Sequence, residues 1–182
     1  ITLAICGKGR GSKDIKSVLA TQIQFDDFPV PLDKIGGKLT FWQPDVTEFV
    51  HPRGTEIVAS KHNQPGGAYG YRLTEGGKTL VYCTDVEHGD GIDKNVVALS
   101  RNADLLIHDA QYTPDELKER KGWGHSSWEQ AVEVAEQAGV SKLALFHHDP
   151  EHSDTFLFDV ESEVQKAFPK VFFAREGMEV EL

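Results

Sequence analysis

The sequence predicts an α/β protein, because short strand-like apolar runs alternate with helical patterns along its 182 residues. The clearest helix is SSWEQAVEVAEQAG, residues 126–139, which has Ser at its start, apolar residues at helical spacing and Gly at its end. A hydrophobic content of 39% and a charged content of 26% are those of an ordinary globular chain. We therefore expect a single domain over residues 1–182.

The first 37 residues predict a strand, a turn, a helix and a loop. ITLAIC (1–6) is apolar enough for a buried strand, and residues 15–23 have the spacing of an amphipathic helix. Between them, GKGRGS (7–12) lacks the spacing of the glycine-rich phosphate-binding patterns, so we interpret it as a strand-to-helix turn. The segment 25–37 contains Pro and Gly and predicts a loop.

The middle of the chain predicts strands. KLTFWQ (38–43) and TEIVAS (55–60) alternate apolar and polar residues with a period of two, as half-buried strands do. YGYRLTEGGKTLVYCTD (69–85) predicts a hairpin, because Glu75-Gly76-Gly77 provides the residues of a tight turn.

The second half alternates regularly between helices and strands. Residues 94–100 predict a helix that leads into the buried strand ADLLIHDA (103–110). Thr113 is a predicted N-cap, since Pro114 would take the first helical position and Glu116 the third. After the helix at 126–139 we expect, in order, the strand KLALFHH (142–148), a helix at 156–168, and the strands KVFFA (170–174) and MEVEL (178–182).

Composition argues against several classes of protein. No run approaches the roughly 18 consecutive apolar residues of a membrane span, and the start lacks the pattern of a secretory signal, so we expect a cytoplasmic protein. The net charge of −10 argues against a long nucleic acid as partner, whereas a small anionic substrate fits if a metal supplies positive charge locally. Cys6 and Cys83 lie in apolar runs and are expected to be small core residues.

Histidines and aspartates follow the predicted strands at four places: His62 after TEIVAS, Asp85 after LVYCT, His108-Asp109 after DLLI, and His147-His148-Asp149 after LALF. Ligands of α/β proteins bind at the ends of strands, and imidazole with carboxylate is a ligand set that zinc accepts.

Each of these residues also has a purely structural explanation. The alternatives are a hydrogen-bonded loop residue for His62, a turn cap for Asp85 or Asp109, a core histidine for His108, and a residue that merely precedes an N-cap for His125. We favour the core role for His108. His88 and His152 are expected to be solvated.

Three segments taken together resemble one family. SKHNQPGGAYGYRLTEGGKTLVYCTDVEH, ADLLIHDAQYT and GHSSWEQAVEVAEQAGVSKLALFHHDP resemble the metallo-β-lactamase superfamily, in the branch of ribonuclease Z and the phosphodiesterases of the phosphonate operon. The resemblance is close over about residues 55–154. It implies an αββα sandwich of the metallo-β-lactamase type, of which this chain would be the carboxyl-terminal two thirds, with the amino-terminal portion missing.

The resemblance implies a role for five residues. His62, Asp85 and His147 match metal ligands of the family, with Asp85 bridging two ions. His125 matches the histidine that stabilises the phosphate or protonates the leaving group. Asp109 stands where the family has an acidic residue, which is placed to hydrogen-bond His125.

The implied function is metal-assisted hydrolysis of a small or cyclic phosphodiester. Two divalent ions, zinc first and manganese or iron as alternatives, would share a hydroxide and polarise the phosphoryl oxygen, while His125 protonates the leaving alkoxide. His148 should point away from the ligand beside it. A thioester or lactone hydrolase of the same superfamily, and a non-catalytic module with this fold, are the alternative functions.

Substrate size follows from the spacing between two of these residues. Only 23 residues separate Asp85 from Asp109, which leaves no room there for the long arm with which ribonuclease Z-like proteins grip transfer RNA. We therefore favour a small phosphodiester over RNA.

One signature of the family is absent from the sequence. His-x-His-x-Asp-His, which supplies most of the metal ligands, does not occur, and the only Met is Met178. We therefore expect a missing amino-terminal half or another chain to complete the site, and little metal binding or activity in this piece alone. An open strand edge would favour pairing with the other half, a homodimer or aggregation.

Overall fold

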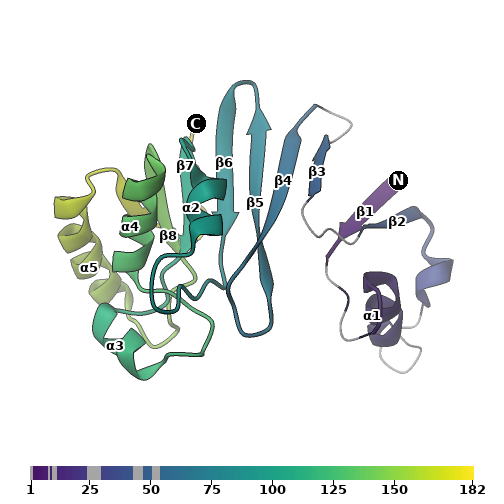
Figure 1. The fold of residues 1–182 in the computed structure, drawn as a ribbon, viewed down its shortest axis with the longest axis horizontal. Coiled ribbons are helices and arrows are strands. Elements are labelled where there is room, and N and C mark those ends of the chain that lie inside the picture. The colour runs from purple at the N-terminus through teal and green to yellow at the C-terminus, as the bar shows by residue number, and fades with distance from the viewer. Residues whose placement is uncertain (1, 8, 10–11, 24–29, 43–46, 51–53) are drawn as a thin grey trace. The chain divides into compact units, whose positions relative to one another are not determined.

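The computed structural model describes residues 2–7, 9, 12–23, 30–42, 47–50 and 54–182 (Figure 1). They fall into two units, Ile1–Asp45 and Val46–Leu182, each with its own internal contacts.

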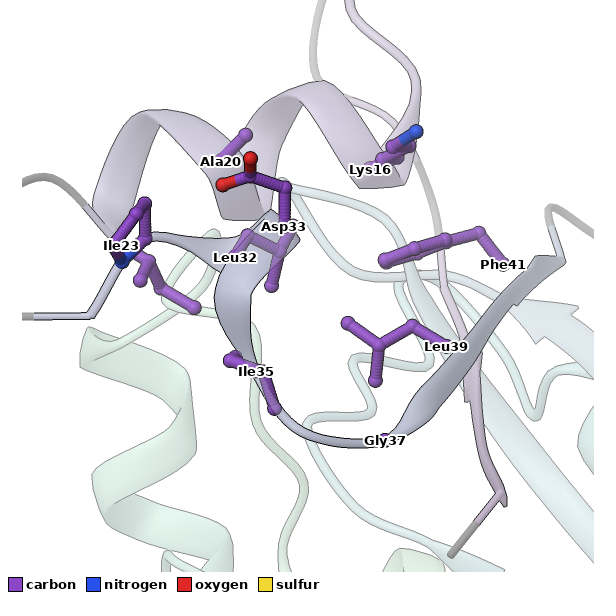
Figure 2. A pocket seen from close by; sticks show the side chains of 10 residues that line it. Lys16, Ala20, Ile23, Leu32, Asp33, Ile35, Gly37, Leu39 and Phe41 are labelled. Atoms are coloured by element: carbon purple, nitrogen blue, oxygen red, sulfur yellow. The ribbon is translucent and has the colours of Figure 1, made fainter.

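The first unit contains two strands, one helix, a short turn and a cavity. Its elements are β1 (Thr2–Cys6), α1 (Ile15–Gln22), a 3₁₀ turn (Leu32–Lys34) and β2 (Lys38–Trp42), with β1 and β2 parallel. Helix α1 begins after Asp14, whose carboxylate accepts the backbone N–H of Ser17 at 2.7 Å. The cavity has a volume of about 360 Å³ and is lined mainly by Ala20, Ile23, Leu32, Ile35, Leu39 and Phe41 (Figure 2).

The second unit is built on a seven-stranded sheet. Its strands, in order across the sheet, are β3 (Thr47–Val50), β4 (Glu56–His62), β5 (Ala68–Glu75), β6 (Lys78–Cys83), β7 (Leu105–Asp109), β8 (Lys142–Phe146) and β9 (Val171–Phe173). Neighbours from β3 to β6 are antiparallel, and neighbours from β6 to β9 are parallel. Since β4 and β6 both run opposite to β5, the carboxyl ends of β4, β6, β7 and β8 lie at one edge of the sheet.

Helices bury one continuous core against this sheet. The helices are α2 (Lys94–Ser100), α3 (Pro114–Glu119), α4 (Trp128–Ala138) and α5 (Asp154–Ala167). Helices α2, α4 and α5 share a buried cluster with the strands, which includes Val81, Val96, Leu106, Val134, Leu143 and Val164. Full burial of an aliphatic side chain stabilises the fold by about 1.5–3 kcal/mol, so this cluster fixes the strand ends that carry the polar residues.

Local signals in the sequence account for most of these elements. Thr113 and Ser127 both form capping boxes, and Gly139 ends α4 in the left-handed conformation at φ 67°. The hairpin turn is confirmed, since Gly76 and Gly77 have φ of 57° and 78°. Residues 7–12 lie between a strand and a helix as expected, although Lys8, Arg10 and Gly11 lie outside the described residues.

One strand was missed, and one predicted strand is absent. Strand β3 was not predicted, because its four residues become a strand only by pairing with β4. MEVEL (178–182) is not a strand, and its apolar residues Met178, Val180 and Leu182 are exposed. The alternating pattern is present there, but no described strand pairs with it.

The remaining expectations concern cysteines and membranes. Cys83 is buried in the core as predicted, whereas the side chain of Cys6 lies outside the described residues. No described helix is both long enough and apolar enough to cross a membrane.

Candidate active site

The carboxyl edge of the sheet brings Asp85, His125 and His147 together. One ligand atom from each lies within 4.8 Å of the others. Asp85 follows β6, His147 follows β8, and His125 lies shortly before α4. Among the described residues this is the one cluster of three or more His, Cys, Asp or Glu with such spacing.

The backbone is unusual at two of these residues. Asp85 has φ of 56° and His147 has φ of 65°, in the left-handed region that residues other than Gly rarely adopt. The chain therefore turns sharply where it leaves β6 and β8. Such conformations cost on the order of 1 kcal/mol or more each and persist where the surrounding structure imposes them, commonly at functional sites.

The buried carboxylate of Asp109 organises the cluster. Its Oδ2 accepts the backbone N–H of Asp85 at 2.9 Å and lies 3.0 Å from His125 Nδ1 and 3.3 Å from His147 Nδ1. Its Oδ1 accepts the backbone N–H of Ser126 at 3.1 Å. Burial alone would raise the pKa of Asp109, but the hydrogen bonds from His125 and Ser126 and the nearby His147 ring outweigh it and hold the pKa well below its usual range. Asp109 is therefore an ionised acceptor at neutral pH.

The predicted contact between Asp109 and His125 is present, and it fixes the tautomer of the ring. Because a carboxylate can only accept, Nδ1 of His125 carries the hydrogen, and its Nε2 is left available. The same carboxylate raises the pKa of His147, against an opposing effect of burial. The His125 and His147 rings lie 4.9 Å apart between centroids.

His62 lies at the same edge but outside this cluster. It is the last residue of β4 and is 4% exposed, and burial lowers its pKa. Its Nδ1 lies 3.4 Å from the carbonyl of Asn63, while its Nε2 is buried without a hydrogen-bond partner. A buried ring nitrogen with a free lone pair is the state that a metal ligand requires.

The core role favoured for His108 is confirmed, whereas the solvated position expected for His88 is wrong. His108 is fully buried, with Nδ1 2.7 Å from the carbonyl of Asp109. His88 is 5% exposed, stacks on His108 at 5.3 Å and accepts the backbone N–H of Asp93 at 3.1 Å. The polar sequence around His88 gave no sign that its loop folds over β7.

His152 is also not solvated. Its Nε2 lies 2.9 Å from Glu116 Oε1, and its ring packs on Phe156 at 4.6 Å. His148, next to His147 in the sequence, does not belong to the cluster of Asp85, His125 and His147. Its ring stacks on Phe173 at 4.9 Å, as expected for a side chain that points away from His147.

Glu87 was missed by the sequence analysis. Its Oε1 accepts the backbone N–H of Gly122 at 2.6 Å, and its Oε2 accepts that of Gly124 at 2.9 Å. It thereby holds the segment that leads into His125. Only the acidic charge of Glu87 is visible in the sequence, because its partners lie far along the chain.

The donor set fits a divalent metal ion. One carboxylate and two imidazoles are ligands of the kind that zinc-type ions accept, and Asp109 behind the rings matches the carboxylate partner that orients metal-bound histidines. The free Nε2 of His62 is a further donor at this edge.

Comparison with known proteins identifies the family of the chain. A family model described as the Beta-lactamase superfamily domain matches residues 11–148. Ribonuclease Z of Gemmatimonas aurantiaca is 36% identical over 107 residues, which cover 58% of this chain and 32% of that protein. Ribonuclease Z of Prochlorococcus marinus is 31% identical over 109 residues, with 58% and 33% covered. The chain thus spans about a third of the length of these curated relatives.

Solved structures show the same fold at low identity. The metallo-beta-lactamase fold protein YhfI from Bacillus subtilis superposes with a TM-score of 0.69 at 23% identity, over 97% of this chain and 64% of that one. The short form of human tRNase Z superposes with a TM-score of 0.70 at 15% identity, over 99% of this chain and 66% of that one. A diphosphatase of the PhnP family gives 0.59 at 14% identity, over 100% and 72%. The described helices and sheet therefore have the metallo-β-lactamase fold.

Proposed function

Because this chain belongs to the Beta-lactamase superfamily, we propose that it forms part of a metal-dependent hydrolase that cleaves a small or cyclic phosphodiester. The observation that carries the proposal is the cluster of Asp85, His125 and His147. Its two imidazole rings both contact the buried carboxylate of Asp109. The proposal treats residues 1–182 as one domain, since the family match runs through both units.

Metal binding is assigned to residues at the strand ends. Asp85 and His147 would hold the ions together with His62, whose Nε2 has no other partner. Two bound divalent ions, zinc by preference, would supply a hydroxide nucleophile and polarise the phosphoryl oxygen. The proposal includes a further segment or a second chain that completes the ligand set.

The remaining residues position and move a proton. Asp109 holds Nδ1–H of His125 at 3.0 Å, so the ring cannot turn and its Nε2 faces away from the carboxylate. When Nε2 is also protonated, His125 can donate that hydrogen to the leaving alkoxide and return to the tautomer that Asp109 favours. Asp109 receives no proton in this step, because its hydrogen bonds keep it ionised.

RNA cleavage is a second candidate, favoured by the name ribonuclease Z of the curated relatives. Against it, the chain has a net charge of −10, and the residues between Asp85 and Asp109 are taken up by α2, β7 and their short connections. The small substrate therefore remains the first choice.

The test uses the full-length protein with its metal content measured by mass spectrometry. We expect hydrolysis of bis(p-nitrophenyl) phosphate, slower cleavage of a precursor transfer RNA, and no hydrolysis of an S-acyl thioester. Activity on the thioester alone would contradict the proposal. Full metal occupancy without any of these activities would indicate the non-catalytic module.

A His125 variant separates the two roles that the geometry allows. His125→Asn should abolish phosphodiester cleavage and leave the metal content unchanged if His125 is the acid. A fall in metal content would instead make His125 a ligand, as its place beside Asp85 and His147 permits.

A further inference from the structure

The segment before His125 presents a large apolar side chain to solvent. Trp123 is 64% exposed, the highest value among the large hydrophobic residues that the structure describes. It lies two residues before His125, whereas Tyr112, whose ring contacts that of His125, is buried. Trp123 therefore offers a solvent-accessible indole ring two residues from His125 in the sequence.

The backbone on both sides of Trp123 is held in place. Gly122 and Gly124 have φ of 86° and 91°, and both of their N–H groups bind the carboxylate of Glu87. The backbone N–H of Trp123 also donates to the carbonyl of Arg120 at 3.2 Å. A charged acceptor that takes two N–H groups makes strong hydrogen bonds, so the loop presents Trp123 from a fixed turn.

The same loop packs against the segment that follows β4. A Cβ on Gly124 would lie 3.1 Å from Gln64 Nε2 and 3.3 Å from Pro65 Cδ, so Gly124 allows close approach as well as the left-handed backbone. The turn that carries Trp123 is therefore fixed to two strand-end loops, those after β4 and β6.

Three basic side chains come shortly before Trp123 in an otherwise acidic chain. Lys118, Arg120 and Lys121 precede it, and a cavity of about 280 Å³ next to the loop is lined by Lys118, Lys121 and His125 together with Glu87 and Asp90. Lys118 and Lys121 pair only with exposed partners, at 2.6 Å with Asp115 and 4.0 Å with Asp90. Exposed pairs are weak, so both lysines can turn to an anionic ligand.

From this arrangement we propose that Trp123 is a stacking platform for the base of a nucleotide substrate, with its phosphate directed to the lysine-lined cavity beside His125. This assignment rests on the proposed phosphodiesterase function and narrows its substrate to the nucleotide class. An aromatic face stacks on any base without requiring a specific hydrogen-bond pattern. Glu87 is the positioning residue that keeps the platform in place.

The test measures binding by ligand-observed NMR titration of the full-length protein with adenosine 5′-monophosphate and with ribose 5-phosphate. The wild type should bind the nucleotide about tenfold more tightly than the sugar phosphate. Trp123→Ala should weaken nucleotide binding about tenfold and change sugar-phosphate binding less than twofold. Trp123→Phe, which keeps a ring, should lose less than threefold, and Phe158→Ala, which removes an exposed aromatic from α5, should change nothing.

Two results would overturn the platform: equal affinity of the wild type for both ligands, or equal weakening of both ligands in Trp123→Ala. Hydrolysis of bis(p-nitrophenyl) phosphate is measured separately and tests the proposed function alone. Hydrolysis without base-dependent binding removes the platform, and base-dependent binding without hydrolysis supports the platform while removing the phosphodiesterase.

Discussion

Two pairs of imidazoles lie at the carboxyl edge of the same sheet and differ in what surrounds them. His88 and His108 stack at 5.3 Å and bind backbone groups through Nδ1. His125 and His147 lie 4.9 Å apart and both face the carboxylate of Asp109. The residue type is the same, and the neighbouring carboxylate makes the difference.

The consequence is that the pKa values of His88 and His147 shift in opposite directions. Burial lowers the pKa of His88 to about 3 and also lowers that of His108, so the first pair is neutral core. Asp109 raises the pKa of His147, which favours the charged form of that ring. The buried carboxylate of Asp109 therefore distinguishes His125 and His147 from the core pair.

The most direct way to break this comparison is to remove the carboxylate. Asp109→Ala leaves the N–H groups of Asp85, His125 and Ser126 without their acceptor. We expect the free energy of unfolding in urea to fall by about 3–5 kcal/mol. Asp109→Asn keeps the size of the side chain and one acceptor oxygen, so its free energy of unfolding should fall by less. A loss below about 1 kcal/mol for the Ala variant would show that Asp109 does not organise the edge.

Matched substitutions test whether only the second pair serves the metal. His147→Asn should weaken metal binding at least 100-fold in chelator competition with the full-length protein, which corresponds to about 2.7 kcal/mol. Asn tolerates the positive φ of His147, so stability should change by less than about 1 kcal/mol. His108→Asn should do the reverse, because it leaves a cavity in a fully buried position. Equal loss of metal affinity in both variants would contradict the assignment of metal binding to the second pair alone.

The neutral pair has a pH signature of its own. Since the folded pKa of His88 is about 3 and its ordinary value is 6.5, the unfolded chain binds a proton between these values and the folded chain does not. His88 should therefore reduce the free energy of unfolding as pH falls from 6.5 towards 3, by about 3 kcal/mol at pH 4. His88→Asn, which keeps an acceptor for the N–H of Asp93, should flatten this part of the profile in urea unfolding. An unchanged slope would mean that His88 is protonated in the folded state.

Sequence reasoning succeeded where local rules decide the structure. The caps at Thr113 and Ser127, the Gly76-Gly77 turn and the helix ending at Gly139 depend on neighbours in sequence, and all are present. It failed where distant pairing decides. Strand β3 exists through β4, and residues 178–182 have the right alternation without a described partner.

The site follows the same division. The order of strands placed Asp85, Asp109 and His147 at one edge, and the family resemblance suggested that Asp109 contacts His125. Three features of the site depend on tertiary packing. They are the positive φ at Asp85 and His147, the contact of Asp109 with both rings, and the hydrogen bonds from two glycines to Glu87. No sequence pattern records them.

A third imidazole–carboxylate pair is less buried than the two on Asp109, and its removal should have the smallest effect on stability. His152 and Glu116 lie 2.9 Å apart with side chains 11% and 30% exposed, and they join the loop after His147 to the start of α3. Burial alone would raise the pKa of Glu116, but hydrogen bonds from His152 and Thr113 outweigh it and lower the pKa to about 2. The stability that this carboxylate contributes is therefore present above its ordinary value of 4.5 and is lost as pH falls through 2.

Glu116→Gln isolates that contribution, because Gln also serves at the third position of a capping box. We expect the variant to be less stable by about 1 kcal/mol at pH 7 and the difference to approach zero near pH 2, in urea unfolding at both values. A difference that is the same at both pH values would assign it to packing, and His152–Glu116 would then be unlike the pair on Asp109. A loss as large as that of Asp109→Ala would show that burial matters less than the ion pair itself.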